Sequence, residues 1–180
     1  MEKLALLIVD VQKGLDDPKY GQRNNLEAEA NIAALLGHWR SQKRPVIHVK
    51  HNSTAPNSPL RPELPGNAIK PEAMPLAHER LFEKTVNSAF IGTDLEAYLH
   101  QNEISSLVIV GLITDHCIST TVRMAANLGF DTTLVSDATA TFERIGHDGN
   151  HFTAEQMHNI NLAALNGEFC TIKTTQELIQ

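Results

Sequence analysis

The chain has 180 residues, about the size of one domain, and 42% of them are apolar, which argues against intrinsic disorder. The formal charge is −6, no basic cluster stands out, and the longest apolar run covers only residues 4–9, so we expect neither a nucleic-acid partner nor a membrane span. With two cysteines and no secretory signal, we expect a single cytoplasmic domain over residues 1–180.

Short apolar runs alternate with helical patterns along the chain. The runs are rich in Val, Ile and Leu, which is typical of strands buried on both faces. In chain order, we predict a strand at 4–9, a helix at 26–43, strands at 45–49 and (weaker) 80–82, a helix at 94–101, a strand at 106–110, a helix at 114–128, a strand at 131–135, a helix at 153–167, a strand at 169–172 and a short helix from 174.

This alternation predicts an α/β fold of right-handed βαβ units with helices on both faces of a parallel sheet. In such open sheets, ligands bind beyond the carboxyl ends of the strands. The residues that follow each apolar run are therefore the candidates for chemistry. A proline-rich segment at 52–78 is too long for an ordinary connection, and we interpret it as an ordered excursion that walls a site or contacts a second subunit.

Cys117 is the first candidate for chemistry. It lies in the first turn of the predicted 114–128 helix, directly after a strand. The free amides and the positive dipole end there favour a thiolate and can bind an oxyanion formed on a substrate carbonyl. The alternative is a small residue buried at a helix–sheet contact. Cys170 lies inside an apolar run, where a structural role is expected.

Asp10 and Lys84 also follow predicted strands. Asp10 can accept the thiol proton of Cys117, with its pKa raised by burial; the alternative is a turn residue that bonds its own backbone. Lys84 can hold a thiolate by its charge; the alternative is an exposed lysine.

Nine histidines raise the question of a metal. His48 and His51 would point to opposite faces of a strand, and glycines place His147 and His151 in a loop. No His-x-His, His-Glu-x-x-His or Cys-x-x-Cys sequence is present, nor any glycine-rich nucleotide signature. We therefore expect no metal and no cofactor.

Three ordered segments resemble the isochorismatase-like cysteine hydrolases. They are LLIVDVQ at 6–12, EKTVNSAF at 83–90 and VGLITDHCI at 110–118. The resemblance extends over about residues 4–172, which is nearly the whole chain, and it is specific for the family but much less so for a substrate.

The resemblance implies a three-layer αβα sandwich around a six-stranded parallel sheet, of Rossmann-like type. It also implies a catalytic triad of Asp10, Lys84 and Cys117. A non-proline cis peptide precedes the nucleophile in the family, here the Leu112–Ile113 bond. Such a bond would aim the backbone amides of Ile113 and Cys117 at one point as an oxyanion hole.

Two departures from the family bear on the substrate. Nicotinamidases bind a metal through an Asp-x-His pair that here reads His51-Asn52-Ser53. Isochorismatases, which cleave an enol ether, lack the nucleophilic cysteine that is present here. We therefore predict a metal-free hydrolase of a small amide or carbamoyl compound that acts through a thioester on Cys117.

Three alternatives stay open: an isochorismatase-type enol-ether hydrolase, a nicotinamidase, and a non-catalytic binding or scaffold member. By analogy with the family we expect a homo-oligomer, either a dimer or a tetramer, with a small-molecule amide as the ligand. The residues predicted to contact the substrate are His51, Asn52, Phe90 and Ile118.

Overall fold

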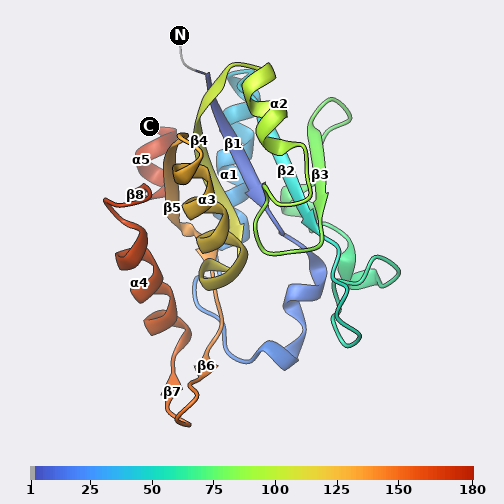
Figure 1. Cartoon of the computed structure of the whole chain (residues 1–180), viewed down its shortest axis with the longest axis vertical. Helices are drawn as coiled ribbons and strands as arrows, with labels where there is room; N and C mark the ends of the chain where they lie inside the picture. Colours follow the sequence, from blue (N-terminus) through green and yellow to red (C-terminus); the bar gives the residue numbers. More distant parts are fainter. Residues whose placement is uncertain (1–2) are drawn as a thin grey trace.

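A computed structural model describes residues 3–180 of the chain. Its centre is one parallel sheet of six strands in the order β3-β2-β1-β4-β5-β8 (Figure 1). The strands are β1 (Lys3–Val9), β2 (Val46–His51), β3 (Arg80–Lys84), β4 (Ile104–Leu112), β5 (Asp131–Ala140) and β8 (Thr171–Lys173). All six strands predicted from apolar runs are confirmed, including the weak one at 80–82.

Helices cover both faces of this sheet and complete the predicted three-layer α/β sandwich (Figure 1). One face is covered by α1 (Ala28–Ser41) and α5 (Thr175–Ile179). The other is covered by α2 (Leu95–Gln101), α3 (Ser119–Asn127) and α4 (Ala154–Leu165). No helix within residues 3–180 is both long and apolar enough to cross a membrane.

The continuous apolar run of β1 follows from its position in the middle of the sandwich. Successive side chains of a strand point to opposite faces. Ala5, Leu7 and Val9 therefore join the core beneath α2 and α3, whereas Leu6 and Ile8 join the core beneath α1. Because both faces are buried, no polar alternation is tolerated along the strand.

The strand order fixes where a ligand can bind. From β1 the chain builds the sheet outward through β2 and β3, and then returns to add β4 on the other side of β1. The carboxyl ends of β1 and β4 are thus neighbours at the point where the order reverses. A crevice opens at such a point in open α/β sheets.

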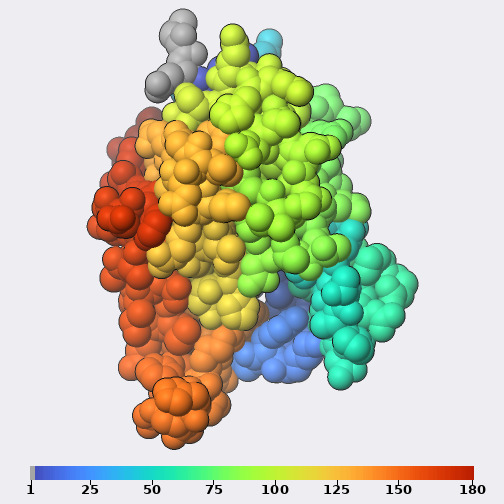
Figure 2. Space-filling view, viewed as in Figure 1, coloured from blue at the N-terminus to red at the C-terminus, as the bar shows by residue number. Residues whose placement is uncertain are grey.

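The proline-rich excursion at 52–78 is pinned to the carboxyl ends of β1 and β2. Its buried Asn67 donates through Nδ2 to the carbonyls of His51 (3.1 Å) and Leu60 (2.7 Å). The fully buried Gln12 donates to Asn67 O at 2.8 Å and forms an isolated bridge with Ile69. Figure 2 shows the excursion, in teal and green, beside the loop after β1, in blue. It therefore serves as a wall at the ligand-binding end of the sheet.

Two local features differ from the prediction. Residues Arg144–Ile145 (β6) and His151–Phe152 (β7) pair as a short antiparallel hairpin where a loop was expected, and the hairpin projects from one end of the molecule (Figure 1). The predicted 114–128 helix begins with a π-type turn, Thr114–Ile118, before the α-helix α3 at Ser119.

Gly111 is required where β4 passes the end of β1. Its φ is +126°, and a Cβ at this position would lie 2.0 Å from the carbonyl oxygen of Val9, closer than any real contact. We expect Gly111→Ala to destabilise the protein by about 3 kcal/mol or more, since the end of β1 must move. Urea unfolding measures this change.

Gly37 provides the matched control. It lies in α1, and a Cβ there would meet nothing within 4 Å. Gly37→Ala should stabilise the protein by about 0.5–1 kcal/mol. Equal effects of the two substitutions would show that the close approach at Gly111 is not what requires glycine.

Candidate active site

The structure brings together the three side chains that the sequence places at separate strand ends. Asp10 follows β1, Lys84 ends β3, and Cys117 lies in the π-type turn after β4. The Lys84 ammonium lies 2.6 Å from Asp10 Oδ2 and 3.3 Å from Cys117 Sγ. A carboxyl, an ammonium and a thiol therefore meet at the crevice between β1 and β4.

Strand alternation explains why Lys84 points inward. In β3, Phe82 and Lys84 are buried whereas Glu83 between them is exposed. Phe82 packs in the core beneath α2 and α3, and Lys84 points to the same face, two residues nearer the end of the strand. The Lys84 ammonium therefore reaches beyond the end of β2 and contacts Asp10.

Asp10 has an unusual backbone and an unusual carboxyl group. Its φ of +54° lies in the left-handed region, which aspartate tolerates better than most residues. The side chain is buried, and among the described residues nothing donates a hydrogen bond to Oδ1. Burial raises the pKa of Asp10, and the Lys84 ammonium opposes that rise. One oxygen is thus held by Lys84 while the other is left to accept a proton.

Burial favours the neutral form of the Cys117 thiol. Burial raises the pKa of the Cys117 thiol above its ordinary range, the Asp10 carboxylate raises it further, and the Lys84 ammonium only partly opposes them. From the sequence, the position of Cys117 at the start of a helix favoured a thiolate. Burial and the neighbouring carboxylate oppose that expectation, so a base is needed to take the proton when the anion forms.

His51, predicted to touch the substrate, lies beside the same ammonium. Its Nδ1 is 3.2 Å from Lys84 Nζ, and burial followed by the nearby ammonium lowers the pKa of His51. The neutral ring therefore presents Nδ1 as an acceptor. Gln12 fixes the backbone of His51 on both sides, accepting from its N–H at 2.9 Å and donating to its carbonyl at 3.0 Å.

Asp10, His51 and Cys117 also form a set of possible metal ligands, since one donor atom from each lies within 4.8 Å of the others. The Lys84 ammonium, however, contacts all three donors, at 2.6, 3.2 and 3.3 Å. A metal held by all three would have to displace this buried cation. The donor set therefore fits an ammonium and does not fit a metal.

The turn that carries Cys117 is closed by one carbonyl. Ile113 O accepts from the amides of His116 at 3.1 Å and Ile118 at 3.3 Å, and the latter bond spans five residues, as in a π-type turn. The Leu112–Ile113 peptide bond is cis. Ile113 and Cys117, predicted as the oxyanion hole, both line the same cavity.

Sequence reasoning missed His158, which supports this turn from behind. His158 lies in α4, is buried, and places Nδ1 2.9 Å from Thr114 Oγ1. Burial lowers its pKa, so the ring is neutral. A signal was present: Ala154, His158 and Leu165 are the buried residues of α4, and the spacing of Ala154 and His158 places them on one helical face.

A cavity of about 170 Å³ opens onto Asp10 and Cys117. Of the four residues predicted to contact substrate, it includes only His51. Asn52 instead donates to Glu83 at 2.7 Å, and Phe90 and Ile118 pack in the core, so these three are not part of the cavity wall. The lining residues are Asp10, Leu15, Tyr20, His51, Ser58, Leu60, Asn87, Leu112, Ile113, His116 and Cys117.

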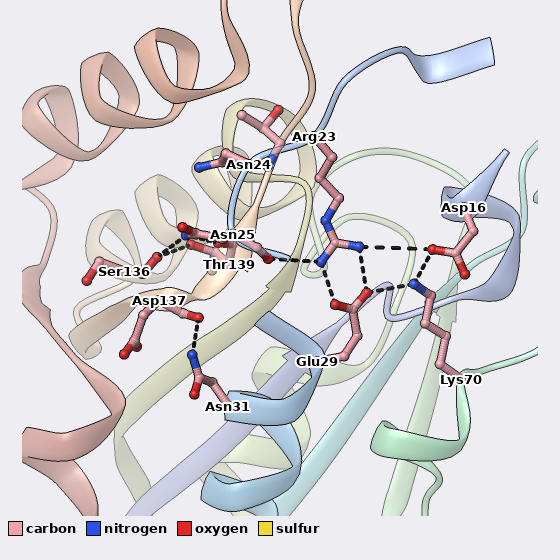
Figure 3. A network of polar contacts seen from close by, with 11 residues as sticks. Asp16, Arg23, Asn24, Asn25, Glu29, Asn31, Lys70, Ser136, Asp137 and Thr139 are labelled. Carbon is pink, nitrogen blue, oxygen red and sulfur yellow. Dashed lines mark hydrogen bonds and ion pairs between the residues drawn. The ribbon is translucent and has the colours of Figure 1, made fainter. Parts of the chain in front are cut away.

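A partly buried ionic cluster anchors the segments that wall this cavity. Figure 3 shows Glu29 of α1 between Arg23 and Lys70, with Asp16 beyond. Lys70 Nζ lies 2.6 Å from Glu29 and 2.5 Å from Asp16. Although burial acts in the opposite direction, hydrogen bonds from Arg23 and Lys70 lower the pKa of Glu29 to about 2. The cluster ties the loop that carries Leu15 and Tyr20 to the proline-rich excursion.

Two of the larger grooves lie at the opposite end of the sheet. They measure about 530 and 480 Å³ and share Lys43, Arg44, Pro45 and Tyr98. Neither contains a thiol, and neither includes any member of the Asp10–Lys84–Cys117 group. The cavity of about 170 Å³ beside Asp10 and Cys117 is therefore the better candidate for an active site.

Comparisons with known proteins show the family and the fold. The sequence matches the isochorismatase domain family over residues 4–176. It is 52% identical to the uncharacterized isochorismatase family protein YrdC of Bacillus subtilis, over 99% of this chain and 95% of that protein. A solved isochorismatase-family structure from Chromobacterium violaceum is 42% identical with a TM-score of 0.96, and the match covers 99% of this chain and 93% of that one.

More distant relatives have names that state an activity. Streptothricin hydrolase of Streptomyces noursei is 29% identical, over 77% of this chain and 50% of that protein. Nicotinamidase 3 of Arabidopsis thaliana is 26% identical, over 80% of this chain and 76% of that protein. An N-carbamoylsarcosine amidase structure from Thermoplasma acidophilum shares the fold, with a TM-score of 0.74 at 21% identity and a match over 96% of each chain.

Proposed function

The chain belongs to the isochorismatase family of hydrolases, and on that premise we propose that it cleaves the C–N bond of a small amide or carbamoyl compound through a thioester on Cys117. One observation carries the proposal: Lys84 Nζ joins Asp10 (2.6 Å) and Cys117 (3.3 Å) at the edge of a cavity. An acid–base group and a nucleophile within reach of one another and of a ligand site are the requirements for covalent catalysis.

The first half of the reaction forms the thioester. Asp10 accepts the Cys117 proton as the sulfur attacks the carbonyl carbon, and the backbone amides of Ile113 and Cys117 hold the oxyanion. Asp10 then gives its proton to the leaving nitrogen, and ammonia or an amine departs. Because the Asp10 pKa is raised by burial, the carboxyl holds this proton more readily than an exposed carboxyl would.

The second half returns the free enzyme. Asp10 takes a proton from a water molecule, whose oxygen attacks the thioester carbon. The C–S bond breaks, the acid product leaves, and the proton returns to sulfur through Asp10. Lys84 keeps a positive charge 3.3 Å from the sulfur throughout, so each anionic stage has a counter-charge. No metal is required at any step.

A nicotinamidase is the alternative that one observation favours, because a named nicotinamidase is among the relatives and nicotinamide is itself an uncharged primary amide. An enol-ether hydrolase would not need the thiol beside Asp10. A scaffold role would not need an unpartnered carboxylate oxygen held beside a thiol.

A screen for ammonia release tests the proposal. Wild-type protein is incubated with small primary amides, ureas and carbamoyl compounds, and Cys117→Ala serves as the blank. We expect Cys117-dependent ammonia release from at least one compound, and an acyl adduct on the wild-type protein of the substrate mass minus ammonia. Full turnover by Cys117→Ala on the same compound would overturn the nucleophile assignment.

A further inference from the structure

We infer that the substrate is a small uncharged amide with a short apolar acyl group, and that compounds bearing a carboxylate are rejected. This inference rests on the proposed amide hydrolysis and specifies its substrate class. Its first support is the apolar part of the cavity, to which three segments of the chain contribute: the loop after β1, the proline-rich excursion and the end of β4. The apolar and aromatic lining residues are Leu15, Tyr20, Leu60, Leu112 and Ile113.

The charge of the cavity provides the second support. No lysine or arginine is among the described residues that line it. The Lys84 ammonium lies behind Asp10, His51 and Cys117 and already contacts all three. A carboxylate in the cavity would therefore face the Asp10 carboxylate without a free counter-ion, and burying an unpaired charge is strongly unfavourable.

Two basic side chains near the cavity face the Asp115 carboxylate. The Arg144 guanidinium, outside the cavity lining, lies 3.2 Å from the Asp115 carboxylate. His116 does line the cavity, but its Nε2 lies 3.7 Å from that same carboxylate. Both side chains therefore already face a carboxylate of the protein, so neither is a free counter-ion for a substrate carboxylate.

Size provides the third support. A cavity of about 170 Å³ holds the volume of about six water molecules. Once the amide group occupies the space beside Cys117, the room left against the apolar wall suits a short acyl group. The remaining polar lining groups, Ser58 and Asn87, are neutral, so they can orient an amide but cannot neutralise a second charge.

A pair of compounds with equal numbers of non-hydrogen atoms tests the inference. In 3-methylbutanamide two methyl groups replace the two carboxylate oxygens of malonamate, and each compound has one primary amide. We expect kcat/KM for ammonia release to be at least 100-fold higher for 3-methylbutanamide, with Cys117→Ala as the blank. Equal rates, or a preference for malonamate, would overturn the inference while leaving amide hydrolysis established.

Two further outcomes separate the two claims. Wild-type protein that releases no Cys117-dependent ammonia from any compound in the wider screen refutes the proposed function itself. Wild-type protein that hydrolyses other compounds but not 3-methylbutanamide refutes only the apolar-acyl assignment.

A cation placed in the cavity should narrow the selectivity against carboxylates. Ser58 lies on the proline-rich excursion and lines the cavity, so Ser58→Arg should raise kcat/KM for malonamate at least 10-fold, whereas the neutral Ser58→Gln should not. Thermal melting verifies that both variants are folded. An equal gain in both folded variants, or no gain in folded Ser58→Arg, would show that a missing cation is not what excludes carboxylates.

Discussion

Cys117→Ser is expected to lower kcat/KM for the amide substrate by at least ~10³-fold, the scale of loss seen when a nucleophile that works with a base is removed. The thiol of Cys117 already has a raised pKa, and a serine hydroxyl is far less acidic still. In the proposed mechanism, the Asp10 carboxylate would have to deprotonate a much weaker acid. Ammonia release under steady-state conditions measures the loss.

Cys170→Ser is the matched control for this prediction. Cys170 is buried in the core, where burial raises its pKa to about 11, and its Sγ lies 3.7 Å from Leu165 O. It contacts none of the three proposed catalytic side chains, so folded Cys170→Ser should keep kcat/KM within about twofold of wild type. Equal losses in both variants would indicate a general effect of losing a buried thiol.

The fold was predictable because its strands are buried on both faces. Runs such as 4–9 and 106–110 must be apolar throughout, and glycine or a capping threonine marks several helix boundaries. The β6–β7 hairpin was not predictable from the same signals. Its strands, Arg144–Ile145 and His151–Phe152, have two residues each, too short to show any periodicity.

Within the site, predictability depended on how far each residue lies from a strand end. Asp10 follows β1, Lys84 is the last residue of β3 and Cys117 lies in the first turn after β4, so parallel topology places all three at one edge of the sheet. The cavity wall comes from loops such as those carrying Tyr20 and Ser58, whose paths are set by long-range hydrogen bonds like that of Gln12 to Asn67 O. Asn52 was predicted to face the substrate. Its side chain instead donates a hydrogen bond to Glu83 of the neighbouring strand β3.

Asp10→Asn is expected to lower kcat/KM by at least ~10³-fold, since asparagine can neither accept the thiol proton nor deliver one to the leaving nitrogen. In wild-type protein, the rate should also fall in acid, because the carboxylate is the active form and is lost as the pH drops through the Asp10 pKa. Burial raises that pKa, so the acid limb should lie above the ordinary carboxyl value of about 4. A pH–rate profile of kcat/KM measures it.

The difficulty with this substitution is that it also removes the partner of a buried cation. Lys84 is only 2% exposed and pairs with Asp10 at 2.6 Å, so Asp10→Asn alone should destabilise the protein by about 3–5 kcal/mol. The double variant Asp10→Asn/Lys84→Met removes both charges and should recover most of that stability, because a neutral pair of similar volume replaces the ion pair. If Asp10 is the base, this stable double variant stays inactive. Activity that returns together with stability would instead show that the ion pair only holds the fold and that another group takes the proton of Cys117.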